Sequence, residues 1–186
     1  MHAEGFLPIS TPAARVLILG SMPGQASLRQ AEYYAHPRNA FWRIMEALFN
    51  VPAALTYAQR TVQLARCGVA VWDVCAVAYR PGSLDTAIRA DSVHANDFAG
   101  FFESHPQITR VCFNGAKAAQ LYRKHVKFDS HMEYCELPST SPAHASLSFD
   151  QKLARWASIK RDTIDTSLTP VLPESSPRPP HPNCVA

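Results

Sequence analysis

Three segments of the chain combine a rigid backbone with polar side chains that suit the binding of bases and phosphates. The first, Gly20-Ser-Met-Pro-Gly24, is a short turn bracketed by glycines. Glycine permits close backbone approach, proline fixes the bend, and N–H groups in such a loop can face an anion or a carbonyl oxygen. No Gly-Lys-Ser/Thr follows and the spacing is not GxGxxG, so neither a Walker A motif nor a dinucleotide fingerprint is present. An ordinary strand-to-loop turn is the alternative interpretation.

The second segment runs from Tyr33 to Trp42 and mixes aromatic, imidazole, guanidinium and amide groups. Aromatic faces suit base stacking, and arginine suits phosphates or base edges. Asn39 could instead be a helix N-cap, and Phe41 with Trp42 could be plain core. The polarity of the segment between two apolar elements favours the binding role.

The third segment is Leu137-Pro-Ser-Thr-Ser-Pro-Ala-His144, in which two prolines stiffen a loop that carries three hydroxyls and an imidazole. Hydroxyls and backbone N–H groups bind phosphates. A stiff loop with a terminal side chain can also act as a wedge in a base stack. A Pro/Ser surface turn without function is the alternative.

Nucleophilic and metal-dependent schemes have weaker support. There is no GxSxG elbow, HxH or HExxH, and a thiol dyad of Cys75 with a histidine conflicts with its place in an apolar run. The five cysteines, at 67, 75, 112, 135 and 184, contain no CxxC, which argues against a zinc ribbon or an Fe–S cluster. We expect reduced, mostly buried thiols.

The composition is that of one globular domain. The 186 residues are 47% hydrophobic and 18% charged, with a net charge of +3. This charge excludes histone-like binding by bulk charge but allows a local phosphate-binding surface. No apolar run approaches the roughly 18–20 residues of a spanning helix, and the N-terminus lacks the pattern of a signal peptide. We therefore expect a soluble, cytoplasmic protein.

Strand and helix patterns alternate along the chain. Short apolar runs predict strands over residues 15–20, 68–75, 109–114 and 133–137. Apolar periodicity and capping residues predict helices over residues 39–50 and 57–66, from a cap at Asp91 or Ser92 to about 104, and over 115–125 and 149–164. Strands separated by helices predict a mainly parallel sheet covered on both faces.

Ligands of such sheets bind outside the carboxyl ends of the strands. The three polar segments lie at these ends, together with Asp73-Val-Cys75 and Asn114-Gly115. Their convergence predicts one site.

The C-terminal stretch has a different composition. Six of the 15 prolines fall between Pro170 and Pro182, which predicts a tail over residues 165–186 without a core of its own. An extended peptide ligand is the alternative. The domain then covers residues 1–164, and without the tail it carries a net charge of +4.

Taken in this order, the segments resemble the uracil-DNA glycosylase superfamily. In that family a Gly-x-x-Pro-Gly-type loop after the first strand lines the base pocket, and a Ser-Pro-rich loop after the last strand penetrates the duplex. The set of Gly20–Gly24 with Ser27-Leu28, Tyr33–Trp42, Asn114-Gly115 and Leu137–Pro142 is similar to the hypoxanthine-DNA (DNA-deoxyinosine) glycosylase branch. The resemblance covers roughly residues 15–160 and implies a three-layer α/β/α fold with a central, mainly parallel four-stranded sheet.

The chain departs from its uracil-excising relatives at two places. Many of them carry His-Pro-Ser where this chain has Leu137-Pro-Ser139, so the histidine donor to uracil is missing. The aspartate that activates water is absent from the first loop, and the resemblance points to Asn39 for that role.

The resemblance also implies the remaining site residues. The base pocket would comprise Gly20, Ser21, Met22, Pro23, Gly24, Tyr34, Phe41 and Asn114, with Asn114 recognising the base or, alternatively, capping the following helix. The DNA-binding loop would comprise Ser139, Thr140, Ser141, Pro142, Ala143 and His144. Ser139 and Ser141 would bind phosphates, and His144 would fill the gap left by a flipped base or lie on the surface.

The expected activity is therefore hydrolysis of the N-glycosidic bond of deaminated bases in DNA, with hypoxanthine favoured. The DNA would be single- or double-stranded, and binding would be salt-sensitive through Arg38, Lys117 and Arg123. No lysine nucleophile lies near the motifs, so no lyase step is expected. No metal, cofactor or membrane is expected, and the chain should be a monomer. A uracil or xanthine glycosylase, or a non-catalytic nucleic-acid-binding module of the same fold, is the alternative.

Overall fold

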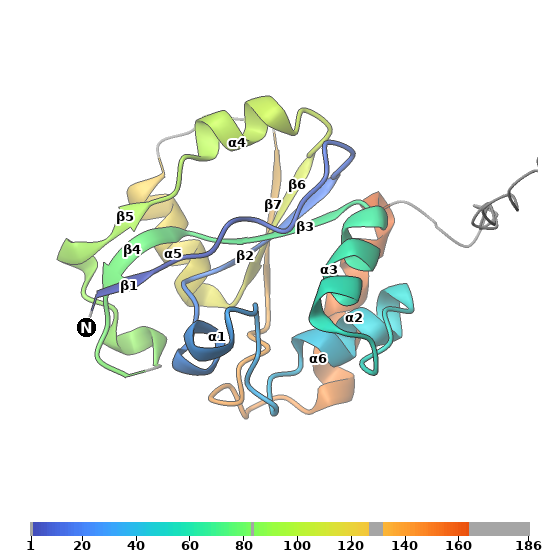
Figure 1. Ribbon diagram of the computed structural model, residues 1–186, viewed down its shortest axis with the longest axis horizontal. Helices are drawn as coiled ribbons and strands as arrows, with labels where there is room; N and C mark the ends of the chain where they lie inside the picture. Colours follow the sequence, from blue (N-terminus) through green and yellow to red (C-terminus); the bar gives the residue numbers. More distant parts are fainter. Residues whose placement is uncertain (1, 83, 127–131, 164–186) are drawn as a thin grey trace, which may run out of the picture.

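The computed structural model describes residues 2–82, 84–126 and 132–163, and its centre is a four-stranded parallel sheet (Figure 1). The strands lie in the order β3 (Val69–Asp73), β2 (Val16–Gly20), β6 (Arg110–Asn114) and β7 (Glu133–Leu137). Every residue of β2, β3 and β6 is buried, as expected for apolar strands covered on both faces. The register pairs Gly20 with Asp73 and Asn114 with Leu137, so the strands end near one edge.

Helices cover both faces of this sheet. They are α1 (Gln25–Gln30), α2 (Phe41–Phe49), α3 (Tyr57–Arg66), α4 (Phe98–Ser104), α5 (Ala116–His125) and α6 (Phe149–Trp156), which continues as the 3-10 helix η3 (Ala157–Asp162). In Figure 1, α2, α3 and α6 lie to the right of the sheet, α5 lies to its left, and α4 lies above it. The predicted three-layer α/β/α fold is confirmed.

Two capping boxes fix the starts of α3 and α6. The hydroxyl of Ser148 accepts a hydrogen bond from the Gln151 N–H, and the Gln151 side chain accepts one from the Ser148 N–H. Thr56 and Gln59 repeat this arrangement at α3. Each box satisfies N–H groups that a helix start leaves without a partner. The fixed start of α6 sets where its side chains meet the loop that precedes it.

A second, antiparallel sheet was not predicted. It consists of β1 (His2–Glu4), β4 (Cys75–Tyr79) and β5 (His94–Ala95), in the order β1-β4-β5. The prediction of one strand over 68–75 merged the end of β3 with the start of β4. The chain turns between them because the Val74 and Cys75 N–H groups donate to the carbonyls of Gly20 and Ser21.

The predicted helix start at Asp91 or Ser92 is wrong. Residues Ala90–Ser92 form a 3-10 turn, η2, and the Ser92 hydroxyl accepts from the Tyr79 N–H at 2.8 Å. The helix begins five or six residues later, with Asp97 as N-cap, whose carboxylate accepts from the Gly100 N–H at 3.1 Å. Asx and Ser residues abound in this stretch, so local capping preference could not select among them.

The cysteines of the described chain are free thiols. Cys67, Cys75 and Cys112 are buried and Cys135 is half-buried, as predicted, and Cys75 is fully enclosed. Within the described ranges, no helix is long and apolar enough to cross a membrane. The predicted tail over residues 165–186, with Cys184, lies outside the described residues.

Candidate active site

A cavity of about 420 Å³ opens above the carboxyl ends of the parallel strands. Its walls come from the first loop, the Tyr33–Asn39 stretch, the ends of β3 and β6, the chain after β4 and the loop after β7. The lining residues are Gly20, Ser21, Met22, Pro23, Gly24, Gln25, Ala26, Ser27, Tyr33, Tyr34, His36, Asn39, Asp73, Arg80, Leu84, Thr86, Asn114, Ser139, Thr140, Ser141, Pro142, Ala143 and His144. The structure thus brings the three polar segments of the sequence to one place.

The first loop is packed tightly against the end of β3. A Cβ atom at Gly20 would lie 2.3 Å from Asp73 Oδ1 and 3.1 Å from Tyr34 Oη, so glycine is required for this close approach. The Pro23 carbonyl accepts a hydrogen bond from the guanidinium of Arg80, which is buried. The loop therefore contacts Asp73 at the end of β3 and Arg80 directly after β4.

The aromatic residues of the second segment divide between the cavity and the core. Tyr34 lines the cavity in a left-handed conformation, with a φ of 57°, and stacks on Phe41 with ring centroids 4.0 Å apart. Phe41 is fully buried behind Tyr34 and does not line the cavity, so its place in the base pocket is corrected. Trp42 is also core, and its Nε1 donates to the Tyr33 carbonyl at 2.9 Å.

Tyr33 has a structural role although its ring borders the cavity. Its hydroxyl donates to the carbonyls of Phe6 and Leu7, at 3.3 Å each. Burial, with the nearby charge of Asp73, raises the pKa of Tyr33, so the phenol remains a donor.

Asn39 both supports the start of α2 and lines the cavity. Its Oδ1 accepts from the Phe41 N–H at 2.9 Å, at the start of α2, and the residue also lines the cavity. Ala40 is the N-cap, so Asn39 supports the helix start from one position earlier. A carboxamide oxygen has two lone pairs, and the amide nitrogen carries two hydrogens. The capping bond therefore leaves hydrogen-bonding capacity on both ends of the amide.

Asn114 anchors the third segment. Its Nδ2 donates to Thr140 Oγ1 at 2.9 Å, and its Oδ1 accepts from the Thr140 N–H at 2.8 Å. The next residue, Gly115, has a φ of +98°, and a Cβ there would lie 3.0 Å from Ser139 Cβ. The sequence predicted base recognition or a helix cap for Asn114. In the structure its side chain fastens the loop after β7 to the end of β6.

The loop after β7 is held at four points. Beside the contact with Asn114, the Thr140 carbonyl accepts from the Ala40 N–H at 3.0 Å. From α6, Trp156 Nε1 donates to the Pro138 carbonyl at 2.9 Å, and Lys152 Nζ donates to the His144 carbonyl at 2.8 Å. Burial lowers the pKa of Lys152. These bonds preorganise the loop around the cavity.

The loop side chains differ in their access to a ligand. Thr140 lines the cavity but is only 1% exposed and bonded to Asn114, so its expected contact with DNA stays a prediction. The hydroxyls of Ser139 and Ser141 accept from the N–H groups of Ser141 and Ala143, both at 3.2 Å, and line the cavity. Pro142, Ala143 and His144 also border it.

Two buried polar residues of the cavity received no role in the predicted site, although the segment that contains Asp73 was placed at its edge. Asp73 is 3% exposed and ends β3, and its backbone carbonyl accepts from Asn96 Nδ2 at 2.8 Å. Arg80 is 3% exposed and directly follows β4, and its Nε donates to the Gly82 carbonyl at 3.1 Å. The place of Asp73 at a strand end was a usable signal. Arg80 gave none, because β4 was not predicted.

Replacing Asn114 with alanine should detach the loop from β6. The change leaves the buried Thr140 N–H and hydroxyl without their partner, at a cost of about 1–3 kcal/mol in the free energy of unfolding. We expect a lower melting temperature and an equal loss of activity on every accepted base, measured by thermal denaturation and single-turnover assays. Thr140→Val removes only the bond between the Thr140 hydroxyl and Asn114. It should lower the melting temperature and the activity by smaller amounts. A loss confined to one base would assign Asn114 to base recognition instead.

The fold and the cavity define an α/β protein with its ligand site at the carboxyl edge of a parallel sheet. The family model of the uracil DNA glycosylase superfamily matches residues 7–183, so the chain belongs to that superfamily.

Relatives and a solved structure agree with this assignment. The chain is 34% identical over 121 residues to a hypoxanthine DNA glycosylase of Methanosarcina barkeri, covering 64% of this chain and 75% of that protein. It is 32% identical over 162 residues to a hypoxanthine DNA glycosylase of Methanosarcina acetivorans, covering 87% and 99%. The solution NMR structure of a candidate uracil DNA glycosylase from M. acetivorans superposes with a TM-score of 0.73 at 31% identity, covering 87% and 98%. The predicted family and its class of activity, DNA glycosylase, are confirmed.

Proposed function

We propose that this chain removes hypoxanthine from deoxyinosine in DNA by hydrolysis of the N-glycosidic bond. The observation that carries the proposal is the cavity of about 420 Å³, whose wall contains Asn39, Asp73 and the loop after β7. This volume lies in the usual range of small-molecule sites and can hold a purine. The names of the two Methanosarcina relatives support hypoxanthine as the base.

The reaction requires the nucleotide to leave the base stack. Flipping costs a few kcal/mol and is easiest at mismatched or damaged pairs. Cleavage then builds positive charge on the sugar and negative charge on the base, which neutral donors in the pocket can stabilise. Asn39 would orient the attacking water through the lone pair that its capping bond leaves available.

Asp73 offers a means of selecting deaminated bases. Hypoxanthine carries a hydrogen on N1, whereas adenine has a lone pair there. A buried carboxylate in the cavity wall attracts the N–H edge and repels the adenine lone pair. Uracil and xanthine also present an N–H, so Asp73 would select the deaminated class and the pocket shape would select the member.

The loop after β7 would hold the DNA. Ser139 and Ser141 border the cavity with hydroxyls that can donate to phosphate oxygens. Of the three cations expected to contact phosphates, Arg38 is exposed, Lys117 bonds Gln120 at 3.4 Å, and Arg123 pairs with Glu136 at 2.7 Å. To bind a phosphate, Arg123 would have to give up its ion pair with Glu136. We therefore expect Arg38 to make the stronger contact with DNA phosphates.

Replacing His144 with glycine should slow base release most from fully paired sites. The residue lies at the cavity border, where its ring can occupy the gap left by a flipped base. Loss of the wedge should cost about 1–2 kcal/mol on paired DNA, roughly a five- to thirty-fold lower rate, and much less on single strands. Single-turnover assays on both substrates measure the difference. Ala145→Gly adds similar backbone freedom and controls for it, and an equal loss on both substrates would contradict the wedge.

The proposed activity is tested with duplexes that carry inosine, uracil, xanthosine or adenine at one position. Alkali cleaves the abasic product, and we expect the fastest release from inosine and none from adenine. The Asn39→Ala protein, purified in parallel, controls for contaminating glycosylases. Binding without release from any duplex would indicate a non-catalytic module. Faster release of uracil or xanthine would contradict the assignment of hypoxanthine.

A further inference from the structure

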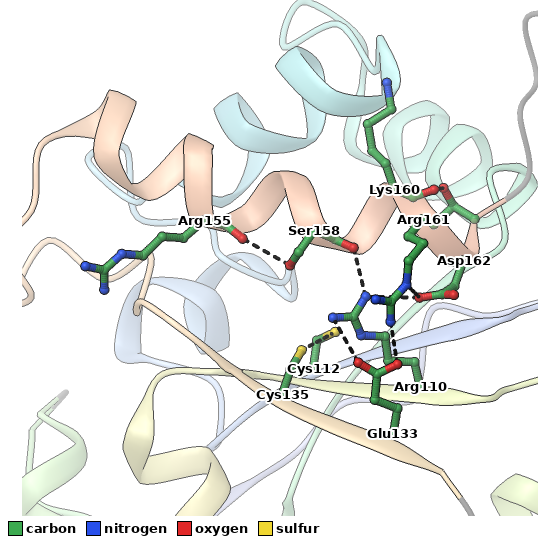
Figure 2. Close-up of polar contacts among 10 residues, drawn as sticks. Arg110, Cys112, Glu133, Cys135, Arg155, Ser158, Lys160, Arg161 and Asp162 are labelled. Atoms are coloured by element: carbon green, nitrogen blue, oxygen red, sulfur yellow. Dashed lines mark hydrogen bonds and ion pairs between the residues drawn. The ribbon is translucent and has the colours of Figure 1, made fainter.

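A pair of thiols lies in the sheet, away from the cavity lining (Figure 2). Cys112 of β6 and Cys135 of β7 are register partners on adjacent parallel strands. Their sulfur atoms share a hydrogen bond at 2.9 Å, and Figure 2 shows the sulfurs pointing toward each other. Adjacent strands are about 4.8 Å apart, within the roughly 4.4–6.8 Å Cα separation that a disulfide bridges. The backbone therefore permits a bond between these sulfurs.

An arginine is fixed beside the two thiols. Arg110 lies two residues before Cys112 on β6, with its side chain 6% exposed. Its Nη1 donates to the Ser158 carbonyl at 2.8 Å and to Asp162 at 3.0 Å, and its Nη2 lies 3.5 Å from Glu133. Arg161 of η3 also pairs with Glu133. These contacts hold a guanidinium charge in the neighbourhood of the sulfurs.

The two thiols differ in access and in acidity. Cys112 is fully buried, whereas Cys135 is only half-buried and so is the more accessible of the two. The hydrogen bond with Cys112 and the charge of Arg110 lower the pKa of Cys135 to about 7, against the opposing effects of burial and of Glu133. The same pairing raises the pKa of Cys112, which therefore remains a thiol that donates to the Cys135 thiolate. This is the arrangement of a reactive cysteine with a resolving partner.

We propose that Cys112 and Cys135 are a redox modification site, at which hydrogen peroxide converts the two thiols into a reversible cross-strand disulfide. The Cys135 thiolate attacks the peroxide, the O–O bond breaks, and a sulfenic acid forms with release of hydroxide. Cys112 then attacks the Cys135 sulfur, its proton joins the departing hydroxyl, and water leaves. The two thiols supply the two electrons that reduce the peroxide, and an external dithiol reverses the step. The site does not depend on the proposed base excision.

The test uses the folded full-length chain and hydrogen peroxide. After exposure and quenching, remaining thiols are alkylated and the digest is mapped by mass spectrometry. We expect a peptide pair joined through Cys112 and Cys135, with Cys67 and Cys75 alkylated only after unfolding, and loss of the joined pair on treatment with dithiothreitol. The rate should rise as the pH passes through about 7 and level off above it, because the thiolate forms above its pKa.

Cysteine variants separate the reactive role of Cys135 from the resolving role of Cys112. In Cys112→Ala the Cys135 sulfenic acid should persist and react with dimedone, whereas Cys135→Ala should leave Cys112 unmodified. Cys67→Ser is the matched control and should oxidise like the parent chain. A bond from either cysteine to Cys184, or dimedone-labelled Cys135 in the parent chain without the joined pair, would overturn the proposal. Because the mapping of the parent chain decides by itself, the proposal stays testable if a variant fails to fold.

Discussion

Replacing Asn39 with alanine should lower the single-turnover rate of hypoxanthine release about 10²- to 10⁴-fold, the usual contribution of a group that activates water. The amide lies in the cavity wall, and the first loop supplies no carboxylate that could take its place. DNA binding should persist, because the loop after β7 is anchored by Asn114, Lys152 and Trp156. Rapid-quench assays measure release, and fluorescence anisotropy with a non-cleavable duplex measures binding.

The same substitution removes the bond from the Phe41 N–H to Asn39 Oδ1, so stability must be separated from catalysis. Loss of a capping bond costs about 1 kcal/mol. Asn39→Ser keeps a capping oxygen but is too short to reach the water that the amide would hold. We expect Asn39→Ser to restore the melting temperature and to remain inactive. If Asn39→Ser restored both the melting temperature and the rate of base release, Asn39 would act through the helix start alone.

The parallel sheet and its site edge could be predicted because each depends on local patterns. Buried parallel strands are continuous apolar runs, and Val16–Gly20 and Arg110–Asn114 read as such. Ligands bind at the carboxyl ends of such strands, so the three polar segments there were expected to form one site. In the structure all three line the same cavity.

The remaining features depend on contacts between distant residues. The turn at Val74 follows from bonds to Gly20 and Ser21, which no local pattern encodes. Phe41 and Thr140 belong to segments that border the cavity, yet each side chain is buried, by stacking on Tyr34 and by bonding to Asn114. Sequence reasoning assigned whole segments to the site, whereas packing decides which side chains within a segment reach the ligand.

The second large effect is expected from Asp73→Asn, which tests base selection. A hydrogen bond to a charged group contributes about 1.5–3 kcal/mol, so release of hypoxanthine should fall roughly 10- to 150-fold. The asparagine amide can donate to the N1 lone pair of adenine, so discrimination against adenine should narrow in the same variant. Steady-state and single-turnover assays on inosine and adenine duplexes measure both changes.

A lower rate on inosine together with a smaller ratio of inosine to adenine release distinguishes base selection by Asp73 from a structural role. Asp73 packs against Gly20 and Tyr34, and a purely structural residue would lower the rates on all bases together. Asp91→Asn, an exposed carboxylate that pairs with Arg89 at 3.1 Å, is the matched control and should leave both rates unchanged. The melting temperature of Asp73→Asn, measured in parallel, separates lost activity from unfolding. A uniform loss with an unchanged ratio of inosine to adenine would reject Asp73 as the selecting group and leave the glycosylase assignment intact.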